Sequence, residues 1–171
     1  MNWGIVCKPQ AKKAVNMAQE IYTFLQEHGA VMAETSLAQE INVPAFTFQD
    51  LDKKADVIVT VGGDGTILLA LSETNKPVFA INLGGMGFLA EVEAKYALEG
   101  LKRIIAGDYN IEERAKLKVV LDGKRLPDAV NEVTIQTARI AKILYLKCFV
   151  DGELAESMGA DGVIVATPTG S

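Results

Sequence analysis

The sequence has little cysteine or histidine: Cys7, Cys148 and the single histidine His28 are all that 171 residues contain. The two cysteines form no CxxC pair and lie far apart in apolar stretches, so a structural zinc site lacks its usual ligands. We therefore expect two reduced thiols packed in cores. His28 precedes Gly29, where a helix is expected to end, which favours a solvent-facing position at the helix C-terminus.

Long apolar runs and excess positive charge are also absent. No run reaches the roughly 20 residues that a membrane-spanning helix needs. The N-terminus lacks a basic segment followed by a small-residue cleavage site, which predicts a cytoplasmic protein. The net charge of −5 and the pI of about 5.0 argue against nucleic acid or anionic membranes as partners. A phosphate ligand would have to be held locally, by backbone N–H groups and a metal ion.

The composition is that of a globular protein, with 49% hydrophobic and 23% charged residues. In the first half, apolar runs typical of buried strands alternate with helical periodicity. Residues 35–54 carry only a weak pattern and predict irregular structure or a short helix. We expect an α/β domain over 1–108, an open and mainly parallel sheet with flanking helices. Strands are predicted at 3–8, 31–33, 56–61 and 77–82, and helices at 11–28, 67–72 and 94–106.

The second half has strand patterns without a long helical segment. It predicts the start of an all-β, antiparallel domain over 109–171, with too few strands to complete a sandwich. The turn at 122–124 is a hairpin signal. The expected strands are 114–121, 131–137, 143–150 and 162–166.

The segment GGDGT, at 62–66, follows a predicted buried strand. Its glycines leave the backbone bare where a helix starts, so free N–H groups point outward and suit a polyphosphate. A carboxylate in such a turn would repel anions unless Asp64 takes a proton from an attacking hydroxyl or binds Mg²⁺ between the charges. The plain structural alternative is a βα turn with Asp64 as the helix N-cap. No GK[ST] follows, so this is not a Walker A loop.

The segment NLGGMGFL, at 82–89, leaves the next predicted strand. Two glycine-rich loops at the carboxyl ends of parallel strands form one crevice. Phe88 would stack on a flat base there or fill the core; the residue type alone does not decide. The pair Asn131-Glu132 suits an adenine edge and a ribose diol. Residues 161–171 predict a strand leading into a hydroxyl-rich turn.

Taken together and in this order, these features resemble the NAD kinase family. The resemblance rests on GGDGT, on an NxGxxGFL loop, on the NE pair at 131–132 and on DGxIxxTPTGS at 161–171. The family implies an N-terminal α/β domain and a β-rich C-terminal domain with the active site between them, in homodimers or homotetramers. The family sequence continues beyond the position of Ser171, so we expect this chain to be part of a longer protein and not fully active alone.

The resemblance also implies the chemistry. Asp64 would be catalytic and act on the 2′-hydroxyl of the adenosine ribose of NAD. That hydroxyl attacks the γ-phosphate of ATP, or inorganic polyphosphate, with Mg²⁺ or another divalent metal present. The positions that it assigns to nucleotide binding are Gly62, Gly63, Gly65, Thr66, Phe88, Asn131, Glu132, Lys142, Asp161, Thr169, Gly170 and Ser171.

Within that set the implied roles differ. Asn131 and Glu132 would bind the ribose and the nicotinamide or adenine portions of NAD, Asp161 the nicotinamide side, and Phe88 would line the adenine pocket. Residues 169–171 would begin the loop that approaches the nucleotide. The family often carries a basic residue where this sequence has Gly159; we expect Lys142 to supply that contact.

The GGDGT turn also suits other interpretations, because other kinase families share it. Lipid kinases of the diacylglycerol or sphingosine type place their NE-like residues soon after the loop, where this sequence has Leu68 to Leu71. The 6-phosphofructokinases use a related turn without TPTGS. A module that binds NAD or NADP without phosphoryl transfer is the non-enzymatic alternative.

Overall fold

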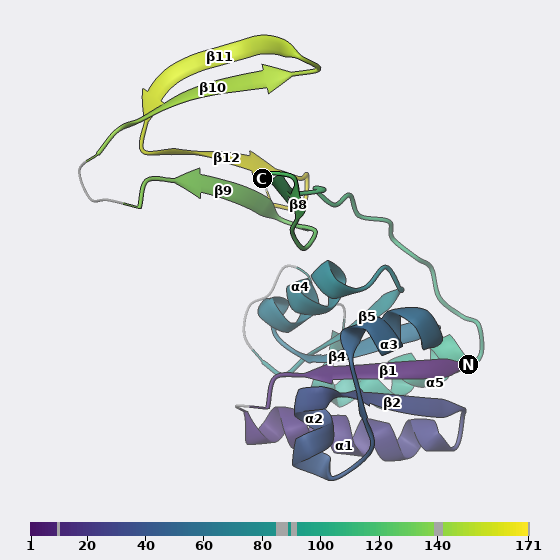
Figure 1. Cartoon of the computed structure of the whole chain (residues 1–171). Coiled ribbons are helices and arrows are strands. Elements are labelled where there is room, and N and C mark those ends of the chain that lie inside the picture. Colours follow the sequence, from purple (N-terminus) through teal and green to yellow (C-terminus); the bar gives the residue numbers. More distant parts are fainter. Residues whose placement is uncertain (10, 85–88, 90–91, 139–141, 171) are drawn as a thin grey trace. The chain divides into compact units, whose positions relative to one another are not determined.

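The computed structural model describes residues 1–9, 11–84, 89, 92–138 and 142–170. The chain divides into two compact units, Met1–Glu113 and Arg114–Ser171. The first is a six-stranded parallel sheet with helices, and the second consists of antiparallel strand pairs (Figure 1). The predicted fold class is therefore confirmed.

In the first unit the strand order is β3-β2-β1-β4-β5-β6, all parallel. The strands are β1 (Asn2–Cys7), β2 (Ala30–Glu34), β3 (Ala45–Phe46), β4 (Val57–Gly62), β5 (Val78–Asn82) and β6 (Val92–Glu93). The helices are α1 (Lys12–Gln26), α2 (Thr35–Ile41), α3 (Phe48–Lys54), α4 (Asp64–Glu73) and α5 (Ala97–Ile105), the last preceded by the 3₁₀ turn η1 (Ala94–Tyr96).

Helices cover both faces of this sheet. The larger core packs α1, α2 and α5 against one face, and the smaller core packs α3 and α4 against the other (Figure 1). Because successive side chains of a strand point to opposite faces, β4 serves both cores: Val57, Val59 and Val61 enter the larger and Ile58 the smaller. Burial on both faces explains why this strand reads as a continuous β-branched run.

The region 35–54 differs from the prediction of irregular structure or a single short helix, because it forms two helices with β3 between them. Local caps compensate for the weak apolar pattern. The Glu34 side chain accepts a hydrogen bond from the Ser36 amide at 2.9 Å at the start of α2. At α3, Thr47 and Asp50 form a reciprocal capping box. Hydrogen bonds from Thr47 and then Lys54 lower the pKa of Asp50 to about 2.

The cysteines differ from one another. Cys7 is buried in the larger core, and burial raises the pKa of its thiol to about 11. Cys148 is only half-buried, so the expectation of two core thiols holds for Cys7 alone.

His28 is exposed just after α1, as expected, with its ring 4.9 Å from that of Phe24. Among the described residues, no helix combines the length and the apolar character needed to cross a bilayer.

The second unit contains three antiparallel pairs: β7 with β8, β9 with β12, and β10 with β11. The predicted hairpin at 122–124 is present, with Asp122 and Gly123 at positive φ. The expected strand at 114–121 is a strand only over Val120–Leu121, and Lys124–Arg125 and Glu153–Ala160 were not predicted as strands. The last of these was missed because its sequence ELAESMGA is poor in β-branched and aromatic residues. The strands are β7 (Val120–Leu121), β8 (Lys124–Arg125), β9 (Glu132–Gln136), β10 (Leu144–Val150), β11 (Glu153–Ala160) and β12 (Gly162–Ala166).

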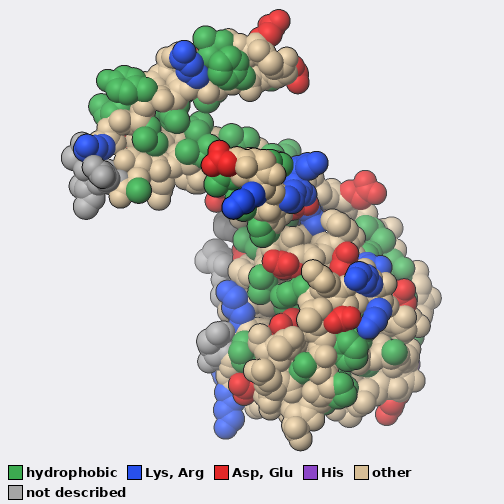
Figure 2. Space-filling model, in the orientation of Figure 1, with side chains coloured by type: hydrophobic (Ala, Val, Ile, Leu, Met, Phe, Trp, Pro, Cys, Tyr) green, Lys and Arg blue, Asp and Glu red, His purple; other side chains and the backbone are tan. Residues whose placement is uncertain are grey.

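Many apolar side chains of the second unit are exposed. Figure 2 shows hydrophobic side chains gathered over the β10–β11 hairpin, where Tyr145 is 91% exposed. Val130 is the one hydrophobic residue that is fully buried among those the structure describes in 114–170. Because isolated strand pairs are marginal in water, the folding free energy of this chain resides mainly in the first unit.

A matched pair of isoleucines tests that assignment. Ile58 is 0% exposed in the smaller core of the first unit, whereas Ile164 is 65% exposed in β12 of the second unit. Ile58→Ala removes buried methyl groups and leaves a cavity, so the free energy of unfolding should fall by about 2–5 kcal/mol. Ile164→Ala should change it by less than about 0.5 kcal/mol. Chemical denaturation measures both, and equal effects would contradict the assignment.

Candidate functional site

The carboxyl ends of the central strands meet at one edge of the parallel sheet. The register pairs Cys7 with Val61 and Gly62 with Asn82, so β1, β4 and β5 end in step. Strand order reverses between β1 and β4, and the helices that follow these strands, α1 and α4, lie on opposite faces. In open α/β sheets, ligands bind outside the carboxyl ends at such a switch point.

The GGDGT turn lies at this switch point. Gly62 is the last residue of β4, Gly63 is the N-cap of α4, and Asp64 is the first helical residue. The interpretation of Asp64 as a plain N-cap is therefore wrong. A Cβ at Gly62 would lie 2.5 Å from the Thr66 hydroxyl, whereas one at Gly63 would meet nothing within 4 Å. Gly62 thus permits tight local packing, and Gly63 leaves open space beside the turn.

The Asp64 carboxylate is held by the second glycine-rich loop. Its Oδ1 accepts a hydrogen bond from the backbone N–H of Leu89 at 3.3 Å. This contact joins the loop after β5 to the GGDGT turn, as expected for two loops at one sheet edge. Residues 85–88 of that loop, and with them Phe88, lie outside the described residues.

Lys8 was missed by the sequence analysis as a site residue. It directly follows β1, and its Nζ lies 3.3 Å from the position that a Cβ on Gly65 would occupy. A signal was available, since 3–8 was predicted as a strand and its carboxyl end must share an edge with that of 56–61. Lys8 thus brings a cationic side chain against the turn.

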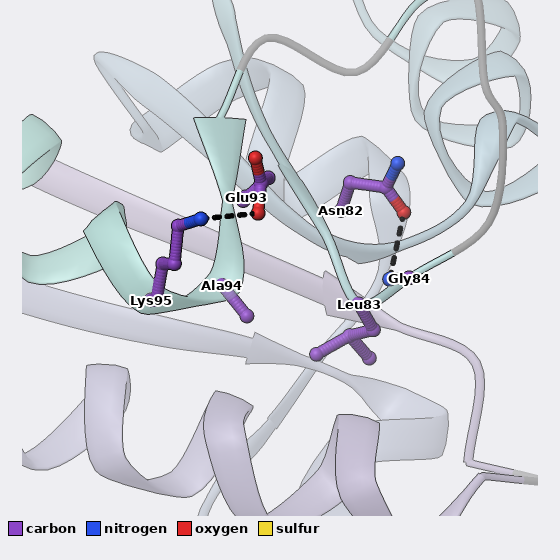
Figure 3. A pocket seen from close by; sticks show the side chains of 6 residues that line it. All are labelled: Asn82, Leu83, Gly84, Glu93, Ala94 and Lys95. Carbon is purple, nitrogen blue, oxygen red and sulfur yellow. Dashed lines mark hydrogen bonds and ion pairs between the residues drawn. The ribbon is translucent and has the colours of Figure 1, made fainter.

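A shallow pocket of about 390 Å³ lies farther along the same edge. Asn82 ends β5 and accepts a hydrogen bond from the Gly84 amide through Oδ1 at 3.1 Å. Across it, Lys95 pairs with Glu93 at 3.0 Å (Figure 3). These contacts fix the start of the second loop. The lining residues are Asn82, Leu83, Gly84, Glu93, Ala94 and Lys95.

In the second unit the structure brings the NE pair and the TPTG turn together. Thr167, just after β12, donates its hydroxyl to the Val130 carbonyl, and its amide donates to the Asn131 carbonyl at 2.8 Å. A Cβ on Gly170 would lie 2.3 Å from the Asn131 carbonyl oxygen, so only glycine fits there. The Arg114 guanidinium donates to the Thr169 hydroxyl at 3.4 Å. The hydroxyl-rich turn is thus tied to the segment that carries Asn131.

The other predicted residues of this unit are spread out. Glu132 begins β9 opposite Ala166, whereas Asp161 precedes β12 and lies at the far end of the same strand pair, beside Thr137. Lys142 is exposed before β10. Its predicted role, to supply the basic contact that the family often places at the position of Gly159, stays a prediction. Ser171 lies outside the described residues.

Packing within the β10–β11 hairpin explains why residue 159 is glycine. Gly159 is paired with Tyr145 across the β10–β11 hairpin, and a Cβ there would lie 3.5 Å from the tyrosine ring and 3.1 Å from Ile143 Cγ2. The exposed ring thus covers the glycine, an arrangement that stabilises glycine within a strand.

The described residues contain no group of three or more His, Cys, Asp and Glu side chains arranged to hold a metal ion. The Asp64 carboxylate is the acidic group placed in the turn, and Thr66 is buried behind it. One carboxylate is what a phosphoryl-transfer site commonly contributes to Mg²⁺, the remaining ligands being water and substrate phosphates. The turn therefore fits a metal that arrives with a phosphate substrate.

Two family matches cover most of the chain: residues 3–109 match the ATP-NAD kinase N-terminal domain and residues 130–171 the ATP-NAD kinase C-terminal domain. Among curated relatives, the NAD kinase of Thermococcus sibiricus is 41% identical over 177 residues and that of Thermoplasma acidophilum 36% over 171. All of this chain is aligned in both cases, but it spans only 64% and 62% of those proteins.

Solved structures give the same likeness. A crystal structure of yeast NADH kinase complexed with NADH matches 99% of this chain with a TM-score of 0.87 at 28% identity, and 58% of that chain is covered. An NAD kinase from Archaeoglobus fulgidus in complex with ATP matches 99% of this chain with a TM-score of 0.71 at 25% identity. The match covers 62% of the Archaeoglobus chain.

The two neighbouring glycines of the turn provide a prediction. Gly62→Ala places a methyl group against the buried Thr66, so the free energy of unfolding should fall by about 1–3 kcal/mol. Gly63→Ala faces open space and loses only the preference of an N-cap for glycine over alanine, so it should lower this free energy by less than about 1 kcal/mol. Thermal unfolding of both variants provides the comparison. A larger loss for Gly63→Ala than for Gly62→Ala would contradict this geometry.

Proposed function

The chain belongs to the NAD kinase family, and from that premise we propose that its complete gene product phosphorylates NAD to NADP. The phosphoryl donor is ATP or inorganic polyphosphate, and the acceptor is the 2′-hydroxyl of the adenosine ribose. A cytoplasmic location and a homodimeric or homotetrameric state stay predictions from the sequence and the family.

One observation supports this function above the others. A carboxylate, Asp64, begins α4 at the switch point of the sheet, directly after Gly63, where a Cβ would meet no other atom within 4 Å. Phosphoryl transfer requires little covalent chemistry from a protein and depends on positioning and on electrostatic stabilisation. A turn that offers bare backbone to phosphates and one carboxylate to a hydroxyl meets both needs.

In the proposed reaction, the 2′-hydroxyl oxygen of NAD attacks the terminal phosphorus of the donor. The bond from that phosphorus to the bridging oxygen breaks, and ADP or a shortened polyphosphate leaves with the bonding electrons. Asp64 accepts the hydroxyl proton, and the Leu89 amide on Oδ1 fixes the orientation of the carboxylate. Asp64 would also hold a divalent metal such as Mg²⁺, which would neutralise the charge that develops during transfer.

Residues of the second unit serve NAD binding in this proposal. Asn131 Oδ1 is buried and has no hydrogen-bond partner among the described residues. A buried acceptor without a donor is unfavourable, and an amino group of the nucleotide would satisfy it. Glu132 would accept hydrogen bonds from ribose hydroxyls. Asp161 would contact the nicotinamide side, and Lys142 would contact a phosphate.

The remaining predicted positions belong to the two loops and the terminal turn. Gly62, Gly63, Gly65 and Thr66 would shape the phosphate-facing turn. Phe88 would line the adenine pocket. Thr169, Gly170 and Ser171 would approach the nucleotide.

Asp64→Asn provides the test in the complete gene product. The amide keeps the size of the side chain but cannot take a proton, so kcat for NADP formation should fall about 10²- to 10⁴-fold. NAD affinity should change by less than about threefold. NADP is measured through an NADP-specific dehydrogenase with ATP or polyphosphate as donor, and NAD binding by calorimetry.

Asp56→Asn, a matched change at the opposite end of β4, is the control and should leave kcat unchanged. Unchanged turnover in Asp64→Asn would exclude Asp64 as the base. A wild-type protein that binds NAD but makes no NADP with either donor would favour the non-catalytic module, and activity on a lipid acceptor would favour the lipid kinases.

A further inference from the structure

We propose that Lys8 binds the phosphates of the phosphoryl donor and stabilises the charge that develops on them during transfer. The inference rests on the proposed function, because it names a further residue of that site. It starts from a juxtaposition: the ammonium of Lys8, at the end of β1, lies against Gly65 in the turn that follows β4.

The position of Lys8 follows from the sheet. β1 and β4 are adjacent and parallel, with Cys7 opposite Val61, so the residue after Cys7 must emerge beside the start of the GGDGT turn. Cys7 is buried in the larger core, which anchors the backbone just before Lys8. The Lys8 side chain extends over the turn, where Nζ lies 3.3 Å from the position that a Cβ on Gly65 would occupy.

The charge of Lys8 is uncompensated locally. The side chain is exposed, and no described carboxylate forms an ion pair with it. The acid within the turn, Asp64, accepts a hydrogen bond from the Leu89 amide. In a protein with a net charge of −5, a cation held beside a bare glycine turn is a specific attraction for a polyanion.

The donor phosphates fit Lys8 better than the pyrophosphate of NAD does. During transfer, negative charge builds on the leaving phosphate oxygens of the donor, whereas the charge of the NAD pyrophosphate does not change. In an in-line displacement, the attacking hydroxyl beside Asp64 and the leaving oxygen of the donor would lie on opposite sides of the phosphorus. A compact ammonium with three rotatable donors can follow the phosphate through the reaction.

Steady-state kinetics of the complete gene product test this role. Lys8→Ala and Lys8→Met should lower kcat/KM for ATP about 10- to 100-fold, the loss expected for one charge-assisted hydrogen bond. The KM for NAD should change by less than about twofold. Lys8→Arg should recover part of the loss. Inorganic tripolyphosphate, used as a competitor of ATP, should inhibit the Lys8→Ala variant more weakly than the wild type.

Lys102→Ala is the control, since Lys102 is an equally exposed lysine in the last turn of α5. If Lys8→Ala behaves like Lys102→Ala, or raises the KM for NAD instead of affecting ATP, the role of Lys8 is overturned. A loss in all parameters with a lower unfolding temperature would also overturn it, as a structural effect. Failure of the proposed function is distinct, because the wild-type protein would then make no NADP.

Discussion

The register between β1, β4 and β5 is the constraint on which the candidate site depends. Both faces of these strands are buried, so a slip of one residue would exchange the side chains of the two cores. That penalty fixes where each strand ends, and the ends decide what the edge presents: Lys8 after β1, the glycine turn after β4 and Asn82 at the end of β5. The chemistry of the edge is thus set by apolar packing beneath it.

The second unit relies on a different constraint, the backbone contact between its two motifs. Gly170 lies so close to the Asn131 carbonyl that a side chain has no room, and the Thr167 hydroxyl and amide bond the carbonyls of Val130 and Asn131. The fold alone therefore explains why positions 170 and 167 of the hydroxyl-rich turn are glycine and threonine, without any ligand. Asn131 Oδ1, buried without a partner, has no such reason within the described residues.

The sequence predicted best where one physical effect dominates. β4 and α1 follow from burial on both faces of a strand and on one face of a helix, and both were predicted to within two residues. β11 was missed because its stability comes from pairing with β10 and not from its own residues. Lys8 was missed because its role depends on a neighbour far away in sequence. The individual roles of Asn131, Glu132 and Asp161 stay predictions, since composition and geometry constrain a site without identifying its ligand.

An acidic protein that binds a polyphosphate must separate its attractive and repulsive charges within one turn. Asp64 is the first residue of α4, where the helix dipole favours a negative charge, and a backbone amide holds Oδ1. Lys8 forms no ion pair with a carboxylate of the described residues, so its charge is available to a ligand. A salt bridge between Lys8 and Asp64 would have cancelled both charges. In the proposed reaction, one turn would therefore present a proton acceptor, oriented by a backbone amide, beside a cation that attracts phosphate.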